Sequence, residues 1–180
     1  AFFIAIFIVM GLKEPKHYSS PEKKIKASEL FKNKKYIRLL LCAFFLMGTN
    51  VGNSTYFGYL FREGGGSLGG IGLAFLLMAG SEAPFMFLIP VINKKVSSEK
   101  LLLFAIGVCT FRFAFYATGP SWQLMLGTFF LQGMSNGIIL VELVRYFSKV
   151  VEPRLASMAV STFYAVGNNL STIVCTFIGG

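Results

Sequence analysis

Residues 68–93 read LGGIGLAFLLMAGSEAPFMFLIPVIN, and this stretch decides the fold class. It holds one charged residue, Glu82, and is followed directly by Lys94 and Lys95. A helix of about 20 mostly apolar residues, rising about 1.5 Å per residue, crosses the hydrocarbon core of a bilayer. The stretch therefore predicts a transmembrane helix that ends at a basic, water-facing loop.

The composition extends this prediction to the whole chain. Of its 180 residues, 54% are hydrophobic and 14% are charged, against about 25% charged in soluble domains, and the mean hydropathy is +0.65. A soluble fold of this size cannot bury so much apolar surface. This excludes a soluble enzyme domain, a disordered chain and a disulfide-rich secreted scaffold. The sequence predicts an all-α membrane protein, an antiparallel bundle of transmembrane helices.

The other apolar stretches divide the chain into three parts. Residues 1–11, AFFIAIFIVMG, are too short for a full span and are predicted to be the end of an earlier transmembrane helix. Residues 12–35 are polar and form a long loop, in which SELFKNKKYIRLL is either an amphipathic helix on the membrane surface or, as we favour, the end of a solvated linker. Residues 36–180 form the bundle, with helices predicted at about 36–61, 68–93, 100–118, 121–146 and 154–180.

The charges of the loops predict the topology. Nine of the 17 Lys and Arg residues lie between Lys13 and Arg38, and the loops 94–99 and 147–153 are also basic, whereas 62–67 is neutral and 119–120 is uncharged. Every second loop is therefore basic, which indicates that 12–35, 94–99 and 147–153 are cytoplasmic. The net charge of +9 follows from this pattern, so no nucleic-acid partner is expected. The predicted location is the plasma membrane, in a bacterium the cytoplasmic membrane.

Catalytic and metal-binding motifs are absent from the sequence. The three cysteines, Cys42, Cys109 and Cys175, lie inside apolar runs without the spacing of metal ligands, and His17 is the only histidine. There is no HExxH, Walker A or nucleophile-elbow sequence. We predict no catalytic residue, no metal site, no cofactor and no enzymatic activity.

Two isolated charges lie within the predicted spans. Because a charge at membrane depth is costly, Glu82 and Arg112 are candidate functional residues. Opposite charges on consecutive helices are expected to satisfy one another, either directly or through a polar cavity. A structural ion pair is the alternative. Glu142 lies three residues before Arg145 and is expected to form a neutralised pair that reaches the interface.

Neutral polar residues recur at helical spacing. Asn50 and Asn53 are three residues apart, Gln132 and Asn136 are four apart, and Asn168 belongs to a stripe with Ser161, Tyr164 and Ser171. Such side chains must face other helices or water rather than lipid. We expect them to face the bundle interior around a hydrated pocket, with interhelical hydrogen bonding as the alternative.

The order of these features resembles the second half of a major facilitator superfamily transporter. A long basic loop precedes a span with paired polar residues, and then follow GGIGLAFLLMAGSEAPFMFLIPVINKK, LLLFAIGVCTFRFAFYATG and LQGMSNGIILVELVRYFSKVVEPRLASMAVSTFYAVGNNLSTIVCTFIGG. The likeness is to the branch of lactose, nucleoside and phenylpropionate permeases. It implies the end of helix six through most of helix eleven of a twelve-helix carrier, a fragment truncated at both ends.

The resemblance also implies roles for single residues. Glu82 matches the eighth-span glutamate of the sugar site, and Arg112 the ninth-span arginine of the proton-coupling network. Elsewhere the sequence departs from the family, since neutral residues replace ionisable ones, which puts lactose-type proton coupling in doubt. Asn50 and Asn53 stand at acidic positions of the seventh span, Gln132 and Ser135 at the His and Glu of the tenth, and Asn168 at the lysine of the eleventh.

These inferences predict a secondary active transporter of a small polar solute, with a sugar or nucleoside favoured, working by alternating access and coupled to protons as a symporter. The alternatives are a receptor or scaffold that keeps the carrier fold, and an efflux carrier of drugs or metabolites. The expected partners are the solute, a proton, the lipid bilayer and the missing N-terminal six-helix half. The predicted substrate-binding or coupling residues are Glu82, Arg112, Asn50, Asn53, Gln132, Asn136 and Asn168.

The topology is tested by labelling the complete protein in intact cells, after its native cysteines are replaced. A cysteine at Ser67 should react with a membrane-impermeant maleimide added from outside, and a cysteine at Ser97 should not, because only the neutral loop is external. The reverse pattern would contradict the predicted orientation.

Overall fold

The structure is a computed structural model that describes residues 28–179. The predicted span end at 1–11 and most of the predicted loop 12–35 lie outside these residues. From residue 28 to residue 179 the chain is helical and contains no strand. This agrees with the all-α membrane class predicted from the sequence.

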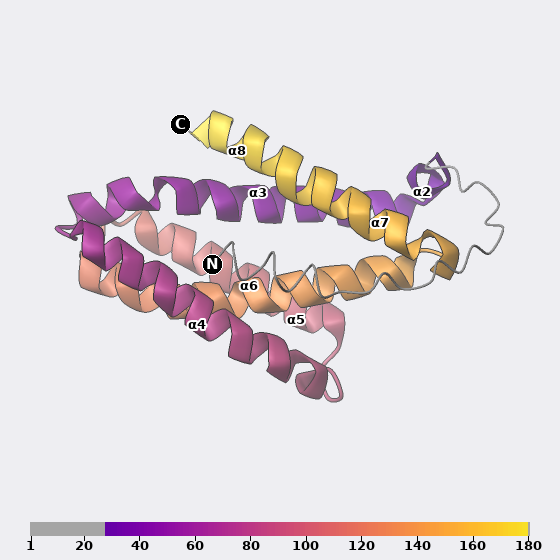
Figure 1. Cartoon of the computed structure of the whole chain (residues 1–180), viewed down its shortest axis with the longest axis horizontal. Helices are drawn as coiled ribbons and strands as arrows, with labels where there is room; N and C mark the ends of the chain where they lie inside the picture. Colours follow the sequence, from indigo (N-terminus) through magenta and orange to yellow (C-terminus); the bar gives the residue numbers. More distant parts are fainter. Residues whose placement is uncertain (1–27, 180) are drawn as a thin grey trace, which may run out of the picture.

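Four long helices form the bundle, namely α3 (Lys34–Glu63), α4 (Leu68–Ile92), α5 (Ser98–Tyr116) and α6 (Trp122–Val150). The short helix α2 (Ser28–Lys32) precedes them. After α6 come η1 (Pro153–Leu155), α7 (Ala156–Thr162), the π-helical η2 (Phe163–Leu170) and α8 (Ser171–Gly179), of which the last three form one continuous rod (Figure 1). The long helices end within four residues of the predicted limits, and the largest difference is at the end of α6, predicted at 146 and found at Val150.

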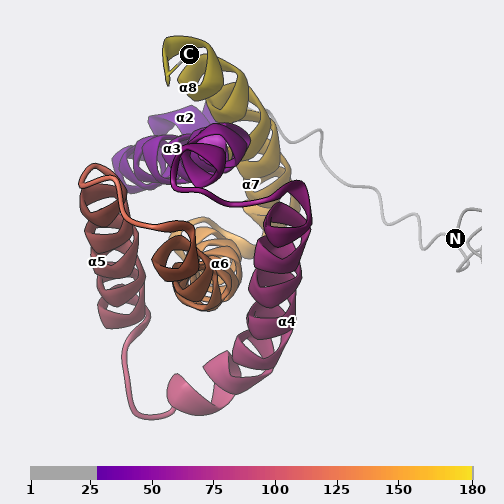
Figure 2. The ribbon, with the colours of Figure 1, turned by 90° about the vertical axis from the view of Figure 1, so that its left-hand side faces the viewer.

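The central helix of the bundle is α6. The end-on view in Figure 2 shows α4 and α5 on opposite sides of α6, with α3 completing the group. The rod of α7, η2 and α8 lies along α3, which it contacts over much of its length. Helix α6 is accordingly the most buried of the long apolar helices, with 50% of its most apolar window buried against 11% for α4.

Three of the described helices, α3, α4 and α6, are long and apolar enough to cross a membrane. Helix α5 is not among them, because its 19 residues include three charged ones, Glu99, Lys100 and Arg112. The last predicted span is interrupted by its π-helical segment. Large apolar side chains cover the outer surface of the bundle, among them Phe45, Leu76, Phe87, Leu103 and Phe177, as expected where lipid replaces water.

Two glycines set the distance between α4 and α6. A Cβ atom on Gly133 would lie within contact distance of the Met78 carbonyl oxygen and Ser81 Oγ, and 3.0 Å from the Glu82 nitrogen. A Cβ on Gly137 would lie 3.1 Å from the Glu82 carbonyl oxygen. Glycines spaced by four residues let two membrane helices approach closely. The Glu82 backbone is thereby held between Gly133 and Gly137.

A layer of polar side chains separates two apolar cores. Towards the basic end of the bundle, the Phe147 ring packs edge-on against Tyr36 and at a tilt against Phe163, with ring centroids 5.5 and 5.0 Å apart. Towards the other end, Phe57 and Phe129 pack with centroids 4.2 Å apart. Along each helix the polar residues fall between the two cores: Asn50 in α3, Arg112 in α5 and Gln132, Ser135 and Asn136 in α6.

At the basic end, α2 docks on the junction between α6 and η1. Leu30 is buried there, and Arg154 donates to Glu152 at 2.6 Å and to Glu29 at 3.1 Å. The hydrogen bond and charge of Glu152, followed by the charge of Glu29, raise the pKa of Arg154 above its ordinary value. Residues 28–32, the start of the predicted SELFKNKKYIRLL segment, therefore form a short helix whose Leu30 side chain is covered by the bundle.

The close crossing of α4 and α6 is tested by a pair of alanine substitutions in the complete protein. Gly133→Ala should destabilise it by about 1–3 kcal/mol, because the new methyl group overlaps the α4 backbone. Gly127→Ala on the same helix meets nothing within 4 Å and should leave stability unchanged or raise it by less than about 1 kcal/mol. Thermal unfolding in detergent measures both. Equal melting temperatures for the two variants would contradict the crossing.

Candidate functional site

A cavity of about 280 Å³ lies between α3, α4 and α6. Glu82 from α4 is the only charged residue among the described residues that line it. Four further side chains can donate or accept hydrogen bonds: Asn50, Ser54, Gln132 and Asn136. The apolar part of the wall comes from Met47, Val51, Phe75, Met78 and Leu140.

The crossing of α4 and α6 brings Glu82 to this cavity. Glu82 is half-buried, and its backbone is enclosed by Gly133 and Gly137. Asn136 lies between these glycines in the sequence, so Glu82 and Asn136 reach the cavity at the same level from facing helices. The sequence predicted Glu82 and Asn136 separately, and the glycine pair explains why they meet.

Arg112 is fully buried beside this cavity and forms no ion pair with any described carboxylate. Its Nη2 donates to Gln132 Oε1 at 2.5 Å and to the Tyr116 hydroxyl at 2.8 Å. The guanidinium carbon also lies 5.2 Å from the centroid of the Tyr116 ring and 5.5 Å from that of Phe129, within the range of cation–π attraction. The direct ion pair between Glu82 and Arg112 that we considered from the sequence is therefore wrong.

Amide side chains connect Arg112 to the cavity. Gln132 Nε2 donates to Ser54 Oγ at 3.0 Å and more weakly to Asn50 Oδ1 at 3.4 Å. Asn50 Nδ2 donates to Asn136 Oδ1 at 2.7 Å. Glu82 and Arg112 are thus linked only indirectly, through the Gln132–Asn50–Asn136 chain that ends at the cavity containing Glu82.

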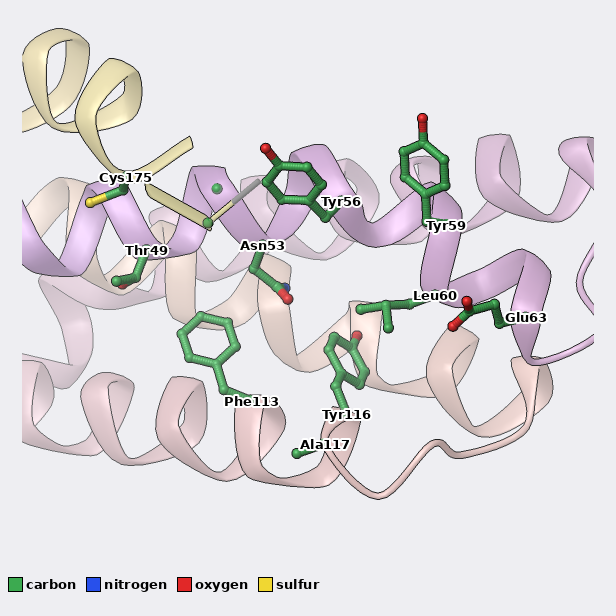
Figure 3. A pocket seen from close by; sticks show the side chains of 12 residues that line it. Thr49, Asn53, Tyr56, Tyr59, Leu60, Glu63, Phe113, Tyr116, Ala117 and Cys175 are labelled. Carbon is green, nitrogen blue, oxygen red and sulfur yellow. The ribbon is translucent and has the colours of Figure 1, made fainter. Parts of the chain in front are cut away.

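Asn53 faces a different cavity, although it is only three residues from Asn50. This second cavity, of about 660 Å³, lies between α3, α5 and the end of α8. Figure 3 shows Asn53 pointing towards it together with Tyr56, Phe113 and Tyr116. Three residues advance a helix by about 300°, so two side chains at this spacing differ in direction by about 60°. Here that difference separates Asn50 from Asn53.

Asn168 joins neither of these two cavities. It is half-buried in the π-helical η2, where its side chain donates to Asn169 Oδ1 at 3.4 Å and its carbonyl oxygen accepts from the Ser171 and Thr172 hydroxyls. The structure therefore brings together Glu82, Asn50, Gln132 and Asn136, places Arg112 directly behind them, and leaves Asn53 and Asn168 apart.

Several residues of this site were not predicted from the sequence. Ser54 lies four residues after Asn50 and so shares its helix face, a signal that was present in the sequence. Tyr116 likewise lies four residues after Arg112. Thr128, which the Tyr116 hydroxyl contacts at 2.6 Å, carried no such signal because it belongs to another helix.

Glu142 is more deeply buried than the sequence indicated. It lies 3.9 Å from Arg145, as its spacing predicts, but its side chain is fully buried rather than directed to the interface. Its Oε1 accepts a hydrogen bond from Asn93 Nδ2, while no partner for Oε2 is found in residues 28–179. Asn93 follows the last residue of α4, so this contact fixes the basic end of α4 against α6.

No cluster of three or more His, Cys, Asp or Glu side chains that could hold a metal ion occurs in the part of the chain that the structure describes. The cavity polar groups are neutral amides, hydroxyls and one carboxyl group. This donor set is suited to hydrogen bonding with a polar solute.

Comparison with known proteins finds relatives that are named as a permease and as a transporter. The chain is 39% identical to the maltose permease of Geobacillus stearothermophilus over 142 residues, 79% of this chain and 36% of that protein. It is 29% identical to the uncharacterized transporter YwbF of Bacillus subtilis over 180 residues, 99% of this chain and 45% of that protein. The chain therefore spans less than half the length of either relative. No solved structure matches significantly.

The family model described as "MFS_1 like family" matches residues 3–180. The match covers nearly the whole chain, including every helix of the site. The chain therefore belongs to the MFS_1-like family of major facilitator superfamily transporters, and is a membrane protein of a transporter family rather than an enzyme family.

Proposed function

We propose that the chain forms one half of a secondary active transporter that moves a small polar solute, with a sugar favoured, by proton symport and alternating access. The observation that carries this proposal is the 280 Å³ cavity, in which the Glu82 carboxyl group faces Asn50, Ser54, Gln132 and Asn136. A sugar hydroxyl both donates and accepts hydrogen bonds. A carboxyl group beside amide groups offers acceptors and donors to such a hydroxyl.

The preference for a sugar has two supports. One relative bears the name maltose permease. The cavity also combines its polar groups with the apolar side chains of Phe75 and Met78, and sugars present apolar C–H faces as well as hydroxyl edges. A nucleoside would use the same donors and acceptors, so it remains the second choice of solute.

We expect the residues on the opposite side of the solute site to come from the rest of the complete protein. The relatives are more than twice as long as the segment matched here. In carriers built from repeated halves, the solute site lies between the halves, near the middle of the bilayer, and each half rocks against the other. The polar layer of this bundle lies between its two apolar cores, which is the depth such a site requires. We assign the protein to the bacterial plasma membrane.

Glu82 is the proposed proton carrier. Removal from water favours the neutral form of a carboxyl group, whereas contact with water or a cation favours the charged form. Alternating access changes the water exposure of the cavity in every cycle. Glu82 would therefore bind a proton in one conformation and release it in the other, which couples solute movement to the proton gradient.

This function is tested by uptake of radiolabelled maltose into cells that produce the complete protein. Glu82→Gln keeps the shape of the side chain and removes its ionisation, so we expect at least about tenfold lower accumulation against a gradient, with normal insertion in the membrane. The matched control is Glu63→Gln, because Glu63 lines the larger cavity instead. It should accumulate maltose as the wild type does.

Two results would contradict the proposal. Full accumulation by Glu82→Gln would make Glu82 a structural residue. Absence of uptake by the wild-type protein, for maltose and for a panel of other sugars and nucleosides, would favour the receptor or scaffold alternative, and export of the solutes would favour an efflux carrier.

A further inference from the structure

Arg112 is the donor in each of the hydrogen bonds that its side chain forms with the described residues. A guanidinium group carries donors and no acceptor, so every hydrogen-bond partner of Arg112 must present an acceptor atom. One branch passes through the Tyr116 hydroxyl to Thr128, whose hydroxyl donates to the Met125 carbonyl oxygen at 2.7 Å. This branch therefore ends at a strong backbone acceptor inside the core.

The other branch runs towards the cavity. Gln132 Oε1 accepts a hydrogen bond from Arg112. The Gln132 Nε2 group must therefore point away from Arg112, towards Ser54 and Asn50. Asn50 then accepts through Oδ1 and donates through Nδ2 to Asn136 Oδ1. Rotating any one amide would place two N–H groups or two carbonyl oxygens against each other, so the amides can reverse only together.

The second branch ends differently from the first. The last donor, Asn136 Nδ2, has only the sulfur of Met78 at 3.7 Å as a partner within the described residues. A thioether is a weak acceptor. Asn136 Nδ2 can therefore donate a further hydrogen bond in the cavity that also contains the Glu82 carboxyl group.

We propose that Arg112 is a positioning residue for the solute site. Its charge orients the Gln132–Asn50–Asn136 chain so that Asn136 presents a donor, and not a carbonyl oxygen, beside the acceptor oxygens of Glu82. The site then recognises a hydroxyl group that accepts from Asn136 and donates to Glu82. This selects polyhydroxy solutes over solutes that only accept or only donate. The inference rests on the proposed function, since it concerns the same cavity.

Three substitutions in the complete protein separate positioning from simple packing. Asn136→Asp keeps the acceptor that Asn50 needs and, when ionised, replaces the N–H donor with a second, negatively charged acceptor oxygen. Gln132→Glu keeps a partner for Arg112, now as a charge-assisted bond, and removes the donor that orients Asn50. Arg112→Lys retains a cation that can only donate, and is the conservative variant that should rescue function, whereas Arg112→Met should not.

The first readout needs no solute. In protein with 15N-labelled asparagine side chains, the Asn136 amide signal is assigned by its loss in Asn136→Asp. We expect this signal to shift in Gln132→Glu and Arg112→Met and to stay near its wild-type position in Arg112→Lys. An unchanged signal in Gln132→Glu would overturn the proposed orientation, whatever the protein transports. Should Arg112→Met fail to fold, Gln132→Glu still decides the question.

The second readout is binding of radiolabelled maltose to the purified protein in nanodiscs. We expect Asn136→Asp and Gln132→Glu to bind at least about tenfold more weakly while both variants remain folded, with cooperative thermal unfolding, and Arg112→Lys to bind within about threefold of the wild type. Wild-type affinity in Asn136→Asp would show that the donor is not used and would overturn the proposal. If the wild type binds no maltose while the amide shifts occur as expected, the orientation stands and the assignment of the sugar fails.

Discussion

A buried cation without a carboxylate partner determines much of the organisation of this bundle. Arg112 is fully buried among described residues that offer it no ion pair. Since such a charge is costly at membrane depth, the surrounding oxygens and aromatic rings must compensate it. Gln132, Tyr116 and Phe129 do so for part of the guanidinium group, whereas its Nε and Nη1 atoms have no hydrogen-bond partner in residues 28–179. The same contacts arrange the polar layer of α3, α5 and α6, and through Gln132 and Asn50 that layer reaches the cavity.

The close approach of the α4 and α6 backbones places Glu82 in the site. Without Cβ atoms on Gly133 and Gly137, α4 approaches α6 closely enough to enclose the Glu82 backbone. The Glu82 side chain therefore lines the same cavity as Asn50, Gln132 and Asn136. Glu142 and Asn93 attach the same two helices further along. For the proposed function this close packing would matter, because the binding of a solute by several hydrogen bonds is sensitive to small displacements of their donors.

The sequence predicted the helices well and the partners of the polar groups less well. Hydropathy and loop charges located the long helices, since membrane burial is a property of each stretch by itself. The pairing of Arg112 depends instead on which faces meet. From charge alone, Glu82 was the favoured partner of Arg112. The rotation of α6 about its axis instead directs Gln132 towards Arg112. The i,i+3 spacing of Asn50 and Asn53 likewise indicated one stripe, but the difference in direction divides them between two cavities.

We propose that the smaller cavity, and not the larger one, binds the solute. This proposal is tested most directly by protection from alkylation, in the complete protein with its native cysteines replaced. Val51→Cys places a thiol in the smaller cavity, and Thr49→Cys places one in the larger cavity, two residues away on the same helix. Maltose should slow the reaction of N-ethylmaleimide with the cysteine at position 51 and leave that at position 49 unchanged. Protection at position 49 alone would show that the solute binds in the larger cavity instead.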